Sequence, residues 1–174
     1  MVVHITNRAV CGLPFVCRLF MSLIIRMLLA KAQCLHPVQV CHFQFMGNHF
    51  HMILAGRGKA ISAFMGFFQG ELAKYIKLIV PKTYQSKFWS GRFKEQKLCT
   101  AVDVMAKIIY TYANPARAGL VSSISEWPGV SSWKMFVSGS TAFSAKFVSI
   151  RDFKKIACKI LSMSDSKASQ ALGS

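Results

Sequence analysis

The sequence predicts an α+β protein with a ferredoxin-like, split βαβ fold, in which an antiparallel sheet carries helices on one face and is followed by a further C-terminal helix. Two observations lead to this prediction. Strand-like and helix-like segments alternate in the order strand, helix, strand, strand, helix, strand, helix. Between the second and third strands lies Gly47-Asn48, a two-residue hairpin signal that makes those strands antiparallel neighbours.

The first half of the pattern contains three strands and one helix. Val2–Thr6 is short, apolar and β-branched, which favours a first strand. A helix is expected over 14–33, because it begins with a proline and its apolar residues recur every three or four positions. The residues of that apolar face are Phe15, Leu19, Leu23, Met27 and Ala30. Val38–Met46 and His49–Leu54 are then the two strands of the hairpin.

The second half adds a helix, a strand and the last helix. Ile61–Ile79 reads as the second helix and Phe88–Cys99 as the fourth strand. The third helix is expected at about Val102–Ala113. It should stop near Asn114-Pro115, because the residue before a proline is disfavoured in a helix.

The 174 residues suit one domain with a substantial core. We expect that domain over residues 1–137, followed by a C-terminal extension over 138–174 that is rich in serine and lysine. Within the extension, only Ile150–Leu161 has a helical pattern, and Ser162–Ser174 is expected to be a frayed tail. Core candidates are Phe15, Leu19, Phe64, Phe67, Phe68 and Ile76.

The charge balance is the first indication of function. Twenty-two lysines and arginines against six aspartates and glutamates give a net charge of +16. Such an excess favours a polyanionic partner, either nucleic acid or an anionic membrane surface. The six carboxylates are scattered along the chain, which argues against a nuclease built on an all-acidic two-metal cluster.

The mean hydropathy of +0.37 raises the question of a membrane span. The longest stretch without a charged side chain, residues 32–56, contains histidines, glutamines and an asparagine, and is too polar to span. No signal-peptide pattern is evident at the start, and the six cysteines form no C-x-x-C pair that would indicate a zinc ribbon. We therefore expect a soluble, cytoplasmic protein without stable membrane association.

Two short patterns carry candidate chemistry. On a strand, His49 and His51 project from one face and Phe50 from the other, so the two imidazoles could bind one divalent ion. They could equally be polar residues on a solvated face. On a helix, Tyr110 and Asn114 share a face and could supply a nucleophile and a further ligand. Taken alone, they could also be a packing tyrosine and a helix-ending asparagine.

Together the two patterns resemble a known family. Phe45–Leu54 resembles the strand pair with the motif MPNHxH of the single-tyrosine HUH transposases, and Tyr110–Val121 resembles their segment YxxxNPVRAGLV. Shorter matches occur at His4–Arg8, Phe88–Phe93, Trp127-Pro128 and Ser131-Ser132. The matches follow the family's order over roughly residues 2–136, and the set is most similar to the REP-associated tyrosine transposases.

The resemblance implies a metal-dependent endonuclease and strand transferase that acts on single-stranded, hairpin-forming DNA. By motif position, Tyr110 is implied as the nucleophile on a catalytic C-terminal helix, and His49, His51 and Asn114 as ligands of Mg²⁺ or Mn²⁺. Attack would form a 5′-phosphotyrosine and free a 3′-hydroxyl, so rejoining needs no nucleotide cofactor. The implied location is the cytoplasm, in association with the nucleoid. Monomer and homodimer both remain open.

Three positions depart from the family pattern. Gly47 replaces a proline in the hairpin turn, which should be preserved. Glu71 places an acid in the second helix, where a more basic surface is expected. Tyr112 is a competing phenol, but on a helix it points about 200° away from Tyr110, so only one of them can face the histidines.

The DNA-binding surface is less specific. Candidates for phosphate contacts are Arg8, Arg57, Lys59, Lys74, Lys77, Lys87, Arg92, Lys94, Lys97 and Arg117, while Trp89 and Phe93 could stack on bases. For each of these, a solvated or core position is an equal alternative. His36 and His42 are expected to be structural. Two other functions stay open: a catalytically inactive protein that binds hairpin nucleic acid, and a peripheral membrane protein that uses the helix at 14–33.

Overall fold

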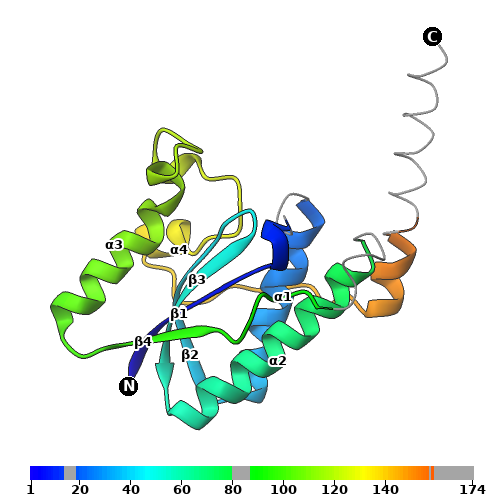
Figure 1. Ribbon diagram of the computed structural model, residues 1–174, viewed down its shortest axis with the longest axis horizontal. Helices are drawn as coiled ribbons and strands as arrows, with labels where there is room; N and C mark the ends of the chain where they lie inside the picture. The colour runs from blue at the N-terminus through cyan, green and yellow to red at the C-terminus, as the bar shows by residue number, and fades with distance from the viewer. Residues whose placement is uncertain (14–18, 80–86, 157, 159–174) are drawn as a thin grey trace.

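The computed structural model describes residues 1–13, 19–79, 87–156 and 158. Its four strands form one sheet in the order β2-β3-β1-β4, with every neighbouring pair antiparallel. The strands are β1 Val2–Arg8, β2 Val38–Phe45, β3 His49–Gly56 and β4 Lys94–Leu98. With one helix between β1 and β2 and another between β3 and β4, this is the ferredoxin-like arrangement, which confirms the predicted fold class (Figure 1).

Helices cover both faces of the sheet. Helices α1 (Leu19–Leu35) and α2 (Gly58–Lys77) pack side by side on one face. Helix α3 (Ala101–Arg117) contacts β2, β3 and β4 from the opposite face, and the short α4 (Trp133–Ser138) lies beside β2 (Figure 1). Among the described residues there are also two single-turn 3₁₀ helices, η1 at Val10–Gly12 and η3 at Ile124–Glu126. No helix among these described segments has the length and hydropathy that a bilayer span requires.

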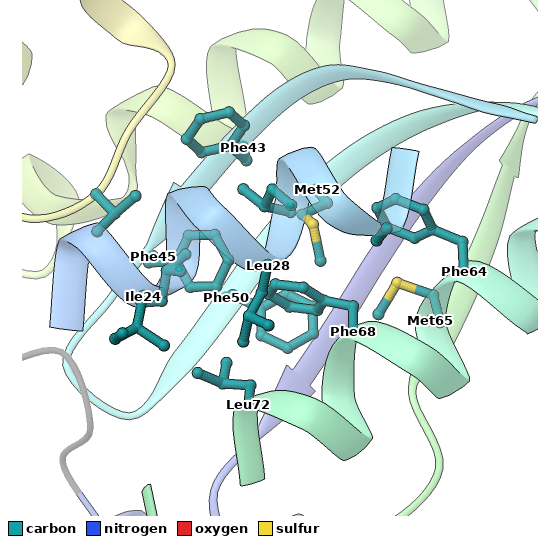
Figure 2. Close-up of a cluster of buried hydrophobic side chains, with 14 of the residues drawn as sticks. Ile24, Leu28, Phe43, Phe45, Phe50, Met52, Phe64, Met65, Phe68 and Leu72 are labelled. Carbon is teal, nitrogen blue, oxygen red and sulfur yellow. The ribbon is translucent and has the colours of Figure 1, made fainter. Parts of the chain in front are cut away.

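The hydrophobic core lies between the sheet and the pair α1 and α2 (Figure 2). Strand β3 contributes Phe50, Met52 and Leu54, which alternate along the strand and are each fully buried. Phe68 of α2 packs edge-on against Phe50, and Phe64 stacks beside Phe68 in the same cluster. Each side chain of this size contributes roughly 1.5–3 kcal/mol when it leaves water. The residues between them on β3 therefore face α3.

Helix α1 shows a difference from the predicted apolar face. Met27 is buried as predicted, but Leu23, which was expected inside, is 57% exposed, and the buried face also includes Met21, Ile24, Ile25 and Leu28. The helix is apolar almost all round, so a second stripe with the same spacing is available and the packing against α2 selects it. The predicted start of this helix at Pro14 lies outside the described residues.

The hairpin between β2 and β3 closes as predicted. Phe45 pairs with Phe50, and the Met46 N–H donates to the His49 carbonyl at 2.8 Å, which leaves Gly47 and Asn48 as the two loop residues. Neither has a positive φ. Because Gly47 does not use the left-handed conformation that glycine permits, this turn does not depend on glycine.

Helix α3 continues beyond its predicted end. We expected it to stop near Asn114-Pro115, and this prediction is wrong, because the helix runs to Arg117 with Pro115 buried inside it. Proline removes one N–H but leaves its carbonyl, which accepts from the Leu120 N–H at 3.0 Å. The end is set by Gly119, whose φ of +68° and bond to Ala116 complete a Schellman motif.

The fourth strand is shorter than Phe88–Cys99, because Trp89 forms only an isolated bridge with Ala9 before the chain turns. Downstream of α4, residues 150–156 are helical and Phe153 joins the core between α1 and α2. The Tyr75 hydroxyl donates to the Val148 carbonyl at 2.8 Å, which ties this segment to α2. The predicted tail at 162–174 lies outside the described residues.

Candidate active site

A cavity of about 730 Å³ opens between α3 and the sheet, where the last residues of β1 pair with the first residues of β3. Its lining includes the predicted site residues His49, His51, Tyr110, Asn114, Arg8, Arg92 and Lys94. These residues come from β1, β3, β4, α3 and the loop before β4, so segments far apart in the sequence meet here (Figure 1).

The two histidines reach the cavity because β3 alternates. Phe50 is fully buried in the core, so His49 and His51 face α3, with their ring centroids 5.2 Å apart. The Nδ1 of His49 lies 2.8 Å from the Oδ1 of Asn48, an atom that can only accept. A neutral His49 with this partner has its proton on Nδ1, so its Nε2 carries none.

His51 is held on both sides. Its Nε2 lies 3.2 Å from the Nδ2 of Asn114, and its Nδ1 lies 3.2 Å from the Nε2 of His4. Its side chain is 5% exposed. Asn114 thus reaches from α3 into the space beside the histidines with its amide nitrogen towards His51, and a rotation of the amide would bring its oxygen to the same place. The sequence assigned no role to His4, although it lies inside one of the matched motifs.

The histidines are electrically neutral at physiological pH. Burial, with smaller contributions from the charges of His4, His49 and Lys107, lowers the pKa of His51 to about 3. Burial and then Lys107 lower the pKa of His4 to about 4. Burial and then Arg8 also lower the pKa of His49, against a hydrogen bond from His49 to Asn114 that raises it. Neutral imidazoles are the form that binds a metal.

Tyr110 lies next to the histidines. Its ring centroid is 5.4 Å from that of His51 in an edge-on arrangement, and the side chain is partly exposed. Lys107 Nζ lies 5.0 Å and Arg117 Cζ 5.7 Å from the centre of the same ring. These two cations give the surroundings of the phenol a positive potential that attracts phosphate.

Tyr112 lies on the opposite side of α3. It is 1% exposed, and its hydroxyl is 2.8 Å from both His42 Nδ1 and Ser132 Oγ. Ser132 in turn accepts from the Phe43 N–H of β2 at 2.8 Å. Burial raises the pKa of Tyr112. Tyr112 therefore anchors α3 to β2, and His42 has the structural position that was expected for it.

The loop before β4 forms the outer wall of the cavity. The N–H and the hydroxyl of Ser90 both donate to the Arg8 carbonyl at 3.0 Å, and Asn7 Nδ2 donates to the Gly91 carbonyl at 3.1 Å. These bonds hold Arg92 beside the end of β1. No role in the site was predicted for Asn7 and Ser90, because their role depends on a contact between segments more than eighty residues apart.

The other predicted DNA contacts lie elsewhere. Arg57 and Lys59 are at the far end of β3, roughly 25 Å along the strand from His49. Lys74 pairs with Glu71 on α2, and Lys77 is in the last turn of that helix. The Trp89 indole donates to the Gln69 carbonyl at 3.0 Å, its ring packs on Phe50, and Phe93 is partly buried beside the core.

A metal at this site depends on Asn114. Across the described residues, no three side chains of His, Cys, Asp or Glu lie close enough together to hold a metal ion. The available donor set is two imidazole nitrogens from β3 and one amide oxygen from α3. An amide oxygen suits Mg²⁺ and Mn²⁺, whereas imidazole nitrogens suit Zn²⁺, Fe²⁺ and similar ions, so this mixed donor set fits a divalent ion without selecting one.

No protein-family model matches the sequence, and no curated protein matches it. Among solved structures, a REP-associated tyrosine transposase bound to a REP hairpin superposes with a TM-score of 0.67 at 20% identity, covering 85% of this chain and 93% of that one. A candidate transposase from Deinococcus radiodurans gives a TM-score of 0.47 at 12% identity, with coverages of 62% and 86%, too low to carry an argument. The motif order in the sequence and the first of these superpositions agree: this chain has the fold of a REP-associated tyrosine transposase.

Proposed function

We propose that this protein is a transposase-type enzyme that cuts and rejoins single-stranded DNA beside a hairpin, with Tyr110 as its nucleophile. The observation that carries the proposal is the meeting of Tyr110, His49, His51 and Asn114 in one cationic cavity. The resemblance of the motifs and the fold itself support it. The hairpin is suggested by the DNA in the structure of the superposed transposase.

His49, His51 and Asn114 would hold a Mg²⁺ or Mn²⁺ ion through two Nε2 atoms and one amide oxygen. When bound, such an ion supplies Lewis-acid polarisation of a phosphate oxygen. Arg8, which lines the cavity next to His49, would orient the neighbouring phosphate by charge. Arg92 and Lys94 occupy the same wall and extend that contact along the strand.

The chemical step belongs to Tyr110. Its hydroxyl oxygen attacks phosphorus, the bond from phosphorus to the 3′-oxygen breaks, and the phenolic proton is lost while the 3′-oxygen gains one. The products are a 5′-phosphotyrosine and a free 3′-hydroxyl. The reverse attack by a 3′-hydroxyl restores a phosphodiester and releases Tyr110, so the phosphodiester energy is retained throughout.

A covalent adduct is the direct test. The full-length protein is incubated with Mn²⁺ and single-stranded hairpin DNA that is labelled at its 3′ end, since the fragment downstream of the cut keeps the tyrosine link. Denaturing electrophoresis should show a labelled protein band, and peptide mapping should place the phosphate on Tyr110. Tyr110→Phe should abolish the band, whereas Tyr112→Phe, the matched control from the same helix, should retain it.

The alternative is a catalytically inactive protein that binds hairpin nucleic acid through its basic surface. It predicts hairpin binding by the parent protein with no adduct at any metal concentration. An adduct on Tyr112 or Tyr75 would instead contradict the choice of nucleophile while preserving the reaction class.

A further inference from the structure

His4 and His51 form a buried pair of imidazoles across two strands. Thr6 of β1 is opposite His51 of β3, so His4 is the diagonal neighbour of His51 on the same face. The two rings stack with centroids 5.3 Å apart and planes inclined by 7°, and the His4 Nε2 lies 3.2 Å from the His51 Nδ1. Each side chain is 5% exposed, so bulk water does not compete for this contact.

A metal ion on the Nε2 of His51 decides where the proton between the two rings must lie. This Nε2 lies 3.2 Å from the Nδ2 of Asn114, so it faces the proposed third ligand. A ligating Nε2 carries no proton, so a neutral His51 then has its proton on Nδ1. That Nδ1–H donates to the His4 Nε2, which must itself be unprotonated.

The opposite arrangement would disable the site. If His4 donated from its Nε2, the Nδ1 of His51 would become the acceptor, and the proton of neutral His51 would move to Nε2. This is the atom that faces Asn114 and the cavity. A metal ion could then bind only after that proton was removed, which would weaken its affinity.

We infer that His4 is a positioning residue that accepts the His51 Nδ1 proton and thereby keeps the His51 Nε2 lone pair available for a divalent metal ion. The inference rests on the proposed function for its metal. Partners that fix the tautomer of a metal-ligating histidine affect metal affinity by about 10–100-fold when they are removed. His4 does not touch the reacting atoms in this role. It acts through His51.

Two variants of His4 distinguish the contribution of its hydrogen-bond acceptor from that of its aromatic ring. His4→Phe keeps an aromatic ring to stack on His51 but offers no acceptor, whereas His4→Gln restores an acceptor without the ring. Two quantities are measured on the full chain. The ¹⁵N chemical shifts of the metal-free protein report the His51 tautomer. Titration with Mn²⁺, followed by the electron paramagnetic resonance of the free ion, gives the affinity for the metal. The matched control is His36→Phe, because His36 packs on Phe67 of α2, on the other side of the sheet.

We expect the parent protein to carry the His51 proton on Nδ1. His4→Phe should populate the Nε2–H form and weaken Mn²⁺ binding about 10- to 100-fold. His4→Gln should recover most of that loss, and His36→Phe should match the parent. A parent protein with the proton on Nε2 overturns the inference without any variant, so the test holds even if His4→Phe does not fold.

An unchanged tautomer with Mn²⁺ affinity within twofold in His4→Phe also overturns the inference. These outcomes are independent of the adduct assay. A parent protein that has the Nδ1–H tautomer but forms no adduct would refute the proposed reaction and leave the role of His4 on His51 standing. A parent that forms the adduct while His4→Phe keeps the tautomer would refute the role of His4 alone.

Discussion

The two faces of the sheet are built on different principles. Against α1 and α2, the strands present a continuous apolar surface in which Phe50, Met52 and Leu54 are fully buried. Against α3, the same strands bury His4, Gln44 and His51. Within the described residues, the Gln44 Nε2 and the Thr111 Oγ1 on this second face make no hydrogen bond. Each such buried polar atom costs about 1–3 kcal/mol. The face towards α1 and α2 therefore stabilises the fold, whereas the face towards α3, called the polar face below, lowers its stability by burying polar groups beside the cavity.

The largest effect should come from the polar face. His49→Ala removes one imidazole from the proposed ligand set, so we expect the DNA adduct to fall by at least about 100-fold. Hairpin binding should change little, because the basic residues that supply most of the affinity remain. Adduct formation and hairpin binding are measured on the same preparation, with His36→Ala as the control. Cleavage at the parent's rate would show that His49 is not a ligand.

A substitution of Phe50, which lies next to His49 on β3 but faces the core, should affect stability rather than adduct formation. Phe50→Ala leaves a cavity between β3 and α2 and should destabilise the fold by about 3–5 kcal/mol. Urea unfolding measures this loss, and His49→Ala should show little of it. Where the Phe50 variant remains folded, its adduct should persist. Equal stability losses in the two variants would remove the distinction between the faces.

Lowering the pH should weaken the polar face selectively. The pKa values of His4 and His51, about 4 and about 3, lie below the value of about 6.5 that the unfolded chain has. The unfolded chain therefore binds more protons between these values, and stability falls as the pH drops from 7 towards 4, by a few kcal/mol. Urea unfolding at several pH values checks this, and His51→Gln should flatten the curve. Constant stability over that range would contradict the burial of neutral imidazoles.

The smallest effect should be a gain. Thr111 is fully buried on α3, and Thr111→Val replaces its unpaired hydroxyl by a methyl group of similar size. We expect about 1 kcal/mol of added stability, a rise of roughly 2–4 °C in Tm. Thr100→Val is the matched control of opposite sign, because the Thr100 hydroxyl accepts from the Asp103 N–H at the start of α3. A lower Tm for Thr111→Val would mean that the hydroxyl is hydrogen-bonded after all.

Short-range patterns were enough to predict the fold class and to pair the candidate residues, while the resemblance to a known family assigned their roles. Alternation on a strand placed His49 and His51 together, and the helical period placed Tyr110 and Asn114 on one face. Both features depend on residues within five positions of each other. The structure keeps them because nothing in the surrounding packing competes with the local geometry.

What the sequence could not predict depends on distant contacts. The end of α3 is decided by Gly119 and its bonds, which outweigh the local effect of Pro115. The buried stripe of α1 is decided by its neighbours, since Leu23 and Ile24 are equally apolar in isolation. The contact between His4 and His51 requires the register between β1 and β3, which no local pattern encodes because the two residues lie forty-seven positions apart in the sequence.

The alternation along β3 also bears on how reliably the chain folds. A slip of one residue against β1 would turn two imidazoles into the apolar layer and expose Phe50 and Met52 to the polar side. Such a mispaired sheet loses the packing of its core and also buries nitrogen atoms without hydrogen bonds, so two separate energetic costs disfavour it. The two histidines proposed as metal ligands thus also favour the correct alignment of β3 with β1 during folding.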